Sequence, residues 1–206
     1  ANGSAPWPVP GVSELDRIDP GYETAPPVDG EFAPYVRDRE TLARAMAIPG
    51  TPGLEHRIGG LEKADGSGDI SYDPANHDLM VRLRQAKIDG ITVPDAVVDD
   101  PSGEADLLLV GWGSSYGPIG EACRRARREG KKVAHVHVRN LNPLPANLGA
   151  VLRSYRTVVA PEMNLGQLAM ILRSRFLVDV QSVTKVKGLA FLGDELHEVI
   201  DSALAG

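Results

Sequence analysis

The fold is decided by residues 105–140, which read ADLLLVGWG (105–113), SSYGPIGEACRRARREG (114–130) and KKVAHVHVRN (131–140). The first and third segments are short apolar runs, which is typical of buried strands. The segment between them has Ile119, Ala122 and Ala126 at helical spacing and ends on Gly130, a common residue just after a helix. A strand, a helix and a second strand joined by short connections predict a right-handed crossover within a parallel sheet.

The same alternation continues to the end of the chain. We expect helices over 145–155, 165–176 and 194–206, and strands over 156–162 and 178–186. With the first unit, this gives four strands and four helices. The sequence therefore predicts a small doubly wound α/β domain with a mainly parallel sheet, which covers residues 104–206.

Residues 1–103 have a different composition. Residues 1–60 hold nine of the sixteen prolines, and proline lacks the N–H that a helix or sheet interior requires. We expect an extended, irregular segment here, either a solvated tail or a strip that packs on a domain or partner outside this chain. A short helix is predicted over 37–47, capped by Asp38 or Thr41, and a second over 75–91. A loop or hairpin is expected over 54–72, and a linker over 94–106 with the domain boundary near residue 103.

Composition limits the function classes. The 206 residues are 42% hydrophobic and 24% charged, with a net charge of −6, which argues against nucleic-acid and membrane-surface partners. No apolar run approaches the roughly 20 residues that span a bilayer, and no secretory signal is seen, so a cytoplasmic protein is expected. The single cysteine excludes a disulfide scaffold and a zinc–thiolate cage.

Three candidate binding positions follow strands, because ligands of open α/β sheets bind beyond the carboxyl ends of the strands. The first is the turn after the first strand, with Gly113 and Ser114, where glycines let backbone N–H groups approach an anion. Its spacing, GxGxxxG, is not a dinucleotide fingerprint. A tight turn with a capping serine explains these residues equally well.

Arg139 and Asn140 follow the second strand, and Asn164 follows the third. An arginine at such a position can clamp a carboxylate or phosphate, or it can form a salt bridge at a subunit interface. Asn164 forms a polar cluster with Glu162 and Gln167 at the start of a helix, which suits a buried network or an interface better than catalysis; Asn164 could equally cap its helix.

The remaining chemistry-bearing residues form no catalytic set. His135 and His137 share one face of a strand without a third ligand at motif spacing, so core or interface positions are expected and no metal site is predicted. Cys123 lies among apolar neighbours and is expected to be inert. The basic run of residues 124–132 is either a solvated helix end or a docking patch. No catalytic residue is assigned.

Five blocks in serial order carry a family resemblance: PYVRDRETLARAMAIPGTPGLEHRIGGLE, NHDLMVRLRQAKIDGI, LLLVGWGSSYGPIGEA, GKKVAHVHVRNLNPLP and VVAPEMNLGQLAMILRSRF. Together they resemble the C-terminal third of the alpha subunit of 2-oxoacid:ferredoxin oxidoreductases, most closely the 2-oxoglutarate type. The resemblance implies that residues 1–103 are the tail of the pyrimidine-binding domain and a linker. It also implies that residues 104–206 form the transketolase C-terminal-like domain, called domain II.

The resemblance implies an enzyme complex that oxidatively decarboxylates a 2-oxoacid to an acyl-CoA. The complete enzyme would use thiamine diphosphate, magnesium, an iron–sulfur cluster and coenzyme A, and it would reduce ferredoxin. None of these cofactors is expected to bind this chain alone, because the ligands of the family lie upstream or on the beta subunit.

The expected partners are the beta subunit and ferredoxin through the complex, with a second copy of the chain as a further option. Gly113, Ser114, Arg139, Asn140 and Asn164 would face a partner or the substrate cleft, in a mainly structural role. Two other classes stay open: a free-standing module that binds a phosphate-bearing ligand, and a dimerisation domain with Val136, Val138 and the helix of residues 165–176 at or near the interface.

Overall fold

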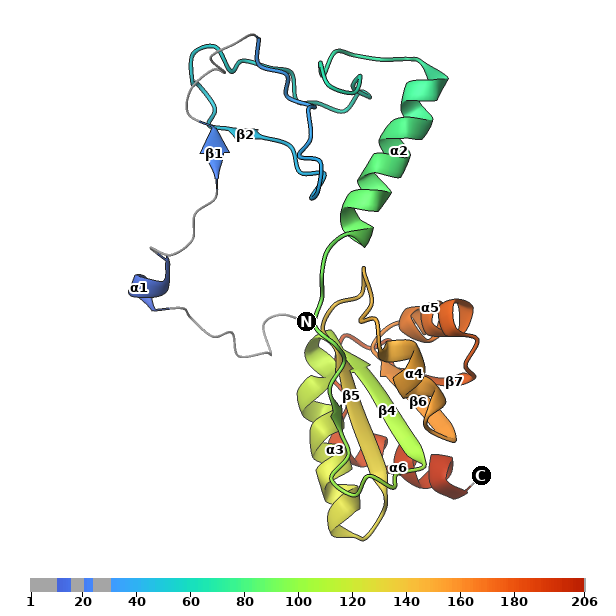
Figure 1. The fold of residues 1–206 in the computed structure, drawn as a ribbon. Helices are drawn as coiled ribbons and strands as arrows, with labels where there is room; N and C mark the ends of the chain where they lie inside the picture. Colours follow the sequence, from blue (N-terminus) through green and yellow to red (C-terminus); the bar gives the residue numbers. More distant parts are fainter. Residues whose placement is uncertain (1–10, 16–20, 24–30, 206) are drawn as a thin grey trace. The chain divides into compact units, whose positions relative to one another are not determined.

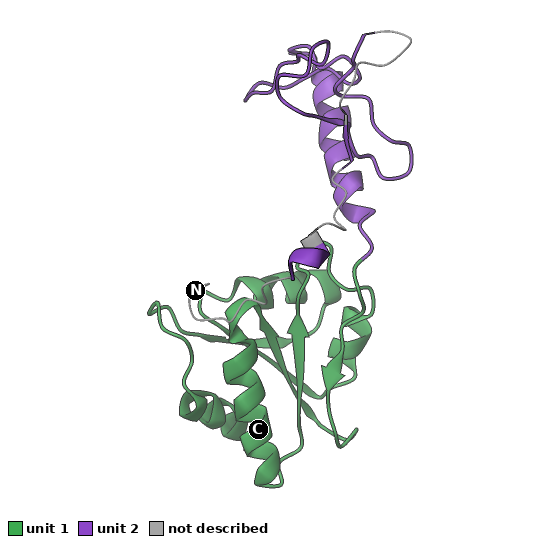
Figure 2. Cartoon of the chain, turned by 90° about the vertical axis from the view of Figure 1, so that its left-hand side faces the viewer, with its two compact units in different colours: residues 1–7, 93–206 green, residues 8–92 purple. Residues whose placement is uncertain are grey.

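A computed structural model describes residues 11–15, 21–23 and 31–205. It divides the chain into two compact units, one of residues 8–92 and one that begins at Val93 (Figure 2). The C-terminal unit thus starts before the boundary expected near residue 103. The expected linker contains a two-residue strand, β3 (Val98–Asp99), which joins the sheet of this unit.

The C-terminal unit is built on a five-stranded sheet in the order β3-β5-β4-β6-β7 (Figure 1). Four strands are parallel: β4 (Leu107–Trp112), β5 (Val133–Val138), β6 (Thr157–Glu162) and β7 (Val180–Thr184). The predicted α/β fold class is therefore confirmed. The edge strand β3 runs antiparallel to β5 and was missed, because two residues carry no periodicity.

Four helices cover the two faces of the sheet. They are α3 (Tyr116–Arg128), α4 (Leu148–Arg153), α5 (Gln167–Phe176) and α6 (Gly193–Ala205). Successive side chains of a strand point to opposite faces, so Leu107 and Leu109 pack with α3 and α6 while Leu108 and Val110 pack with α4 and α5. Each of these fully buried side chains contributes about 1.5–3 kcal/mol. None of the described helices is long and apolar enough to cross a membrane.

The N-terminal unit holds one long helix, α2 (Pro74–Asp89), as predicted. Asp73 caps it by accepting a hydrogen bond from the Ala75 N–H at 3.0 Å, and proline occupies its first turn. Only Met80 is buried along this helix. The unit also contains α1 (Val12–Leu15), β1 (Tyr22–Glu23) and β2 (Met46–Ala47), which pairs with β1.

The helix predicted over residues 37–47 is wrong. Asp38 Oδ1 accepts hydrogen bonds from the backbone N–H of Thr41 at 2.7 Å and from that of Glu40 at 3.1 Å, as a cap would. The chain then reverses, since Leu42 adopts φ 56° and Arg37 pairs antiparallel with residue 44. The capping signal was real, but it closes a tight turn instead of starting a helix.

Candidate functional site

The sequence-predicted site residues lie at one edge of the sheet. β5, β4 and β6 are parallel neighbours, so the residues that follow them emerge at the same carboxyl edge. After β4 come Gly113 and Ser114, after β5 come Arg139 and Asn140, and after β6 comes Asn164. The five residues share this edge but are not in contact through hydrogen bonds: none links any two of them in the described part of the chain.

The turn after β4 is closed by its own serine. Ser115 Oγ donates to the carbonyl of Trp112 at 2.8 Å and accepts from the N–H of Trp112 at 3.0 Å. Gly113 has φ 57°, a conformation that side-chain-bearing residues rarely adopt. Ser114 is half-buried, and its hydroxyl has no hydrogen-bond partner among the described residues. The geometry is that of a tight strand-to-helix turn.

Glu162 is the central residue of a buried polar network at this edge; the sequence suggested the network but not which groups Glu162 binds. Its side chain is 1% exposed. Its carboxylate accepts hydrogen bonds from the backbone N–H groups of Leu168 (2.8 Å) and Ala169 (3.0 Å), at the start of α5. Two side chains also donate to this carboxylate: the indole N–H of Trp112 at 3.2 Å and the side-chain amide of Asn164 at 3.1 Å. A carboxylate at a helix N-terminus suits the positive end of the helix dipole.

Asn164 has a structural task in the same network. Its Oδ1 accepts hydrogen bonds from the N–H groups of Gly166 at 2.7 Å and Gln167 at 3.1 Å. The amide thus ties the loop after β6 to the start of α5. The only sequence signal for this cluster was the grouping of Glu162, Asn164 and Gln167 within six residues.

The Trp112–Glu162 contact joins the two parallel strands at which the strand order reverses, since β5 lies on one side of β4 and β6 on the other. Ligands of doubly wound sheets commonly bind at this switch point. Here β4 and β6 are paired only from Leu107 to Leu109 on β4. Past Leu109 the two strands are no longer paired, and there the Trp112 indole donates its hydrogen bond to the Glu162 carboxylate.

Arg139 and Asn140 are the exposed, unengaged members of the predicted set. Within the described residues, neither side chain forms a hydrogen bond or an ion pair. Both line a cavity together with Tyr116, His135 and His137. The two histidines share one face of β5, as their spacing predicted, but their position beside a cavity was not foreseen.

The described residues do not fit a metal or an iron–sulfur cluster. They contain no group of three or more His, Cys, Asp or Glu side chains that could hold a metal ion. The single thiol, Cys123, is fully buried in α3, and burial raises its pKa to about 12. An iron–sulfur cluster needs several thiolates.

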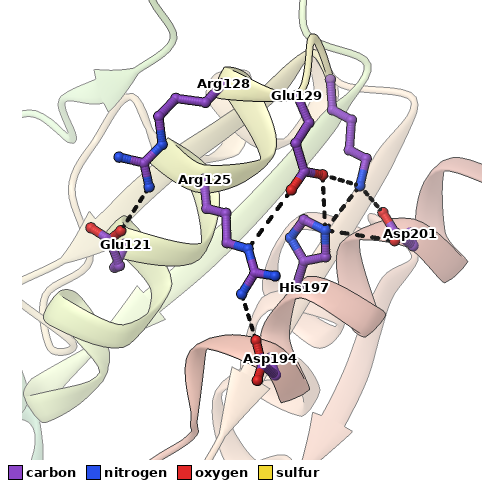
Figure 3. Close-up of polar contacts among 8 residues, drawn as sticks. Glu121, Arg125, Arg128, Glu129, Asp194, His197 and Asp201 are labelled. Atoms are coloured by element: carbon purple, nitrogen blue, oxygen red, sulfur yellow. Dashed lines mark hydrogen bonds and ion pairs between the residues drawn. The ribbon is translucent and has the colours of Figure 1, made fainter.

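The basic run at the end of α3 is engaged within the chain. Arg125 bonds Asp194 at 2.5 Å, and Lys131 bonds Asp201 at 2.5 Å and Glu129 at 2.9 Å (Figure 3). These contacts join α3 and the turn after it to α6. The structure favours a paired, solvated helix end over a free docking patch for acidic partners.

Comparisons with known proteins agree with this fold. Residues 105–199 match the family model of pyruvate:ferredoxin oxidoreductase core domain II. The whole chain is 72% identical over 207 aligned residues to the 2-oxoglutarate oxidoreductase subunit KorA of Mycobacterium tuberculosis, and it covers 31% of that protein. It is 34% identical to subunit alpha of 2-oxoacid:ferredoxin oxidoreductase 2 from Aeropyrum pernix, over 79% of this chain and 26% of that relative.

A solved structure shows the same likeness. The 2-oxoglutarate:ferredoxin oxidoreductase of Magnetococcus marinus, determined with 2-oxoglutarate, coenzyme A and succinyl-CoA bound, aligns with a TM-score of 0.75 and 30% identity. The alignment covers 88% of this chain and 32% of that one. The chain therefore spans between about a quarter and a third of the length of these relatives. The resemblance recognised in the sequence is confirmed.

Proposed function

Because the chain belongs to the family of 2-oxoacid:ferredoxin oxidoreductase alpha subunits, we propose that it works as part of such an enzyme, with 2-oxoglutarate as the oxoacid. The observation that carries the proposal is the 72% identity to a 2-oxoglutarate oxidoreductase subunit along the entire chain. The reaction would be an oxidative decarboxylation that yields an acyl-CoA and reduces ferredoxin.

In this proposal the cofactors are held by other parts of the enzyme. When bound, thiamine diphosphate accepts the electrons of the decarboxylated substrate, and an iron–sulfur cluster passes them on. The described residues supply no metal cluster, and the switch point of the sheet is closed by Trp112 and Glu162. The chain's contribution is then to hold subunits together and to shape a wall of the cleft.

The exposed apolar surface of α5 supports a role in assembly. Leu165 just before the helix is 83% exposed, Met170 64%, Ile171 46% and Leu177 just after it 90%. Isolated exposed apolar residues are common on proteins, but a group on one element marks an interaction site. We assign this group, which we call the α5 surface, to contact with another subunit, either the beta subunit or a second alpha subunit.

Met170→Glu tests this assignment in the complete alpha subunit co-expressed with its beta subunit. A charge at this position should sharply reduce recovery of the complex, since burying an unpaired carboxylate is costly. Met170→Leu keeps an apolar side chain and should co-purify like the parent. Both variants should melt like the parent as isolated chains, because residue 170 is exposed.

The readout also distinguishes the alternative classes. A complex that forms normally with Met170→Glu would contradict the interface assignment. A parent complex without 2-oxoglutarate- and coenzyme A-dependent ferredoxin reduction would contradict the enzyme assignment. In that case a phosphate-ligand module centred on the Gly111–Gly117 turn would be the next hypothesis.

A further inference from the structure

The C-terminal unit contains a cavity of about 570 Å³ that the proposed function does not use. It lies between α3, β5 and the segment that leads into β3. Cavities of roughly 300–1,000 Å³ are the usual size of small-molecule sites. Six residues matter here: Tyr116 and Gly120 on α3, His135 and His137 on β5, and Arg139 and Asn140 beyond its end.

Three rings form one wall of the cavity. The Tyr116 ring centroid lies 5.0 Å from that of His137 and 5.7 Å from that of His135. His135 is 3% exposed, yet its buried Nε2 has no hydrogen-bond partner, and the same holds for Nδ1 of His137. Buried polar atoms are seldom left unpaired. A molecule in the cavity cannot reach these two enclosed atoms. The other nitrogen of each ring, Nδ1 of His135 and Nε2 of His137, forms no hydrogen bond among the described residues and is not enclosed, so a bound molecule can pair with it.

The imidazoles act as neutral groups. Burial lowers the pKa of His135 to about 4 and also lowers the pKa of His137. At neutral pH the reachable nitrogen of each neutral ring is either a donor or an acceptor, depending on the tautomer, which matches the edge of a heterocycle better than a bare anion.

The charge available to a ligand comes from Arg139. Arg124 also lines the cavity, but it forms an ion pair with Glu121 at 3.0 Å. Asp99, another lining residue, forms an ion pair with Arg127 at 2.8 Å. Asp95, on the segment before β3, is exposed and can accept a hydrogen bond from a ring N–H or amino group. The cavity thus combines an aromatic wall, mixed donors and acceptors, and one unpaired guanidinium.

Glycine at position 120 leaves room beside the deeper histidine. A Cβ at this position would lie 3.8 Å from His135 Nδ1 and 3.4 Å from Arg124 Nη1. A larger side chain on this helix would therefore enter the space next to the imidazole.

We propose that this cavity binds a planar heterocyclic anion. The ring packs against Tyr116 and hydrogen-bonds to the imidazole pair, and the phosphate or carboxylate pairs with Arg139, assisted by the Asn140 amide. Nucleoside monophosphates and small heterocyclic carboxylates share this chemistry, so both are tested as probes.

The experiment titrates the full chain with AMP, nicotinate, adenosine and inorganic phosphate while following the histidine ring resonances by NMR. At least one ring-bearing anion should bind with a Kd below about 1 mM. If the site takes a nucleoside monophosphate, AMP should bind at least about tenfold tighter than adenosine or phosphate alone. The His135 and His137 signals should shift, whereas those of His56 and His77 in the N-terminal unit should not.

Two variants decide whether the site is the predicted one. Arg139→Gln should weaken binding at least about tenfold, while Arg156→Gln, an exposed arginine just before β6, should leave it unchanged. Gly120→Val should abolish binding. The proposal is overturned if neither AMP nor nicotinate binds, or if binding is insensitive to both Arg139→Gln and Gly120→Val. Neither result bears on ferredoxin reduction, so the two proposals fail separately.

Discussion

Glu162 shows how one buried carboxylate fixes the edge of the sheet. It joins the end of β6 to the first turn of α5 and to the indole of β4 through hydrogen bonds of 2.8–3.2 Å. Hydrogen bonds to charged groups contribute about 1.5–3 kcal/mol each, and buried donors left unpaired add a penalty. The grouping of Glu162 with Asn164 suggests a polar network, but no residue pattern identifies the other donors, because the indole and the two backbone N–H groups meet the carboxylate only in the folded chain.

We expect Glu162→Ala to lower the free energy of unfolding by about 2–4 kcal/mol, because it removes the acceptor of four donors, two of them backbone N–H groups. Urea unfolding followed by circular dichroism measures the change. Gln167→Ala, at an exposed side chain of the same helix, should change stability by less than about 0.5 kcal/mol. Equal effects of the two substitutions would refute the assigned role.

The Cys123 thiol should not react with thiol reagents in the folded chain. Burial raises its pKa to about 12, so the nucleophilic thiolate is scarce at mildly alkaline pH and the sulfur is inaccessible. An aromatic disulfide reagent should react with the chain only after guanidinium chloride is added. Rapid labelling under native conditions would show that α3 opens readily or is packed differently.

At the scale of elements, the sequence predicted what periodicity encodes. The four parallel strands were predicted from short apolar runs or their place between helices, and the helices from apolar residues at helical spacing; their positions were predicted within a few residues. β3 and the turn at Asp38 were not, since both depend on partners distant in the chain or on a positive φ at Leu42. The carboxyl edge followed from topology, whereas the cavity beside it did not.

The pairing of α3 with α6 should show up as acid sensitivity. The hydrogen bond from Lys131 holds the pKa of Asp201 and of Glu129 below their ordinary values of 3.8 and 4.5. A depressed pKa in the folded state adds stability above the unfolded value, and this stability is lost as the pH falls through the folded value. The effect is modest because these side chains are exposed.

Lys131→Met should therefore be less stable than the parent near neutral pH, and the difference should shrink as the pH falls below about 4.5. Concentrated salt should shrink it as well. Thermal unfolding across this pH range measures both effects. A difference that stays constant from neutral to strongly acidic pH would mean that packing of the lysine stem, rather than its charge, stabilises the contact.

At the scale of the molecule, several apolar side chains of the chain are exposed to solvent. Leu79 and Val81 on α2 are 42% and 45% exposed, and the α5 surface is more exposed still. The chain spans about a third of the length of these relatives. The serial order of five motifs, not any single residue pattern, led to the family, because Gly113 and Asn164 serve the turn and the helix start, and Arg139 and Asn140 have no partner among the described residues.

The most direct measurement is ferredoxin reduction by the complete alpha and beta subunits, compared with a complex whose alpha subunit lacks this segment and with that complex supplied with the chain in trans. We predict 2-oxoglutarate- and coenzyme A-dependent activity in the complete complex, its loss without the segment, and partial recovery when the chain is added. Equal activity with and without the segment would contradict the assignment of this chain as a working part of the oxidoreductase.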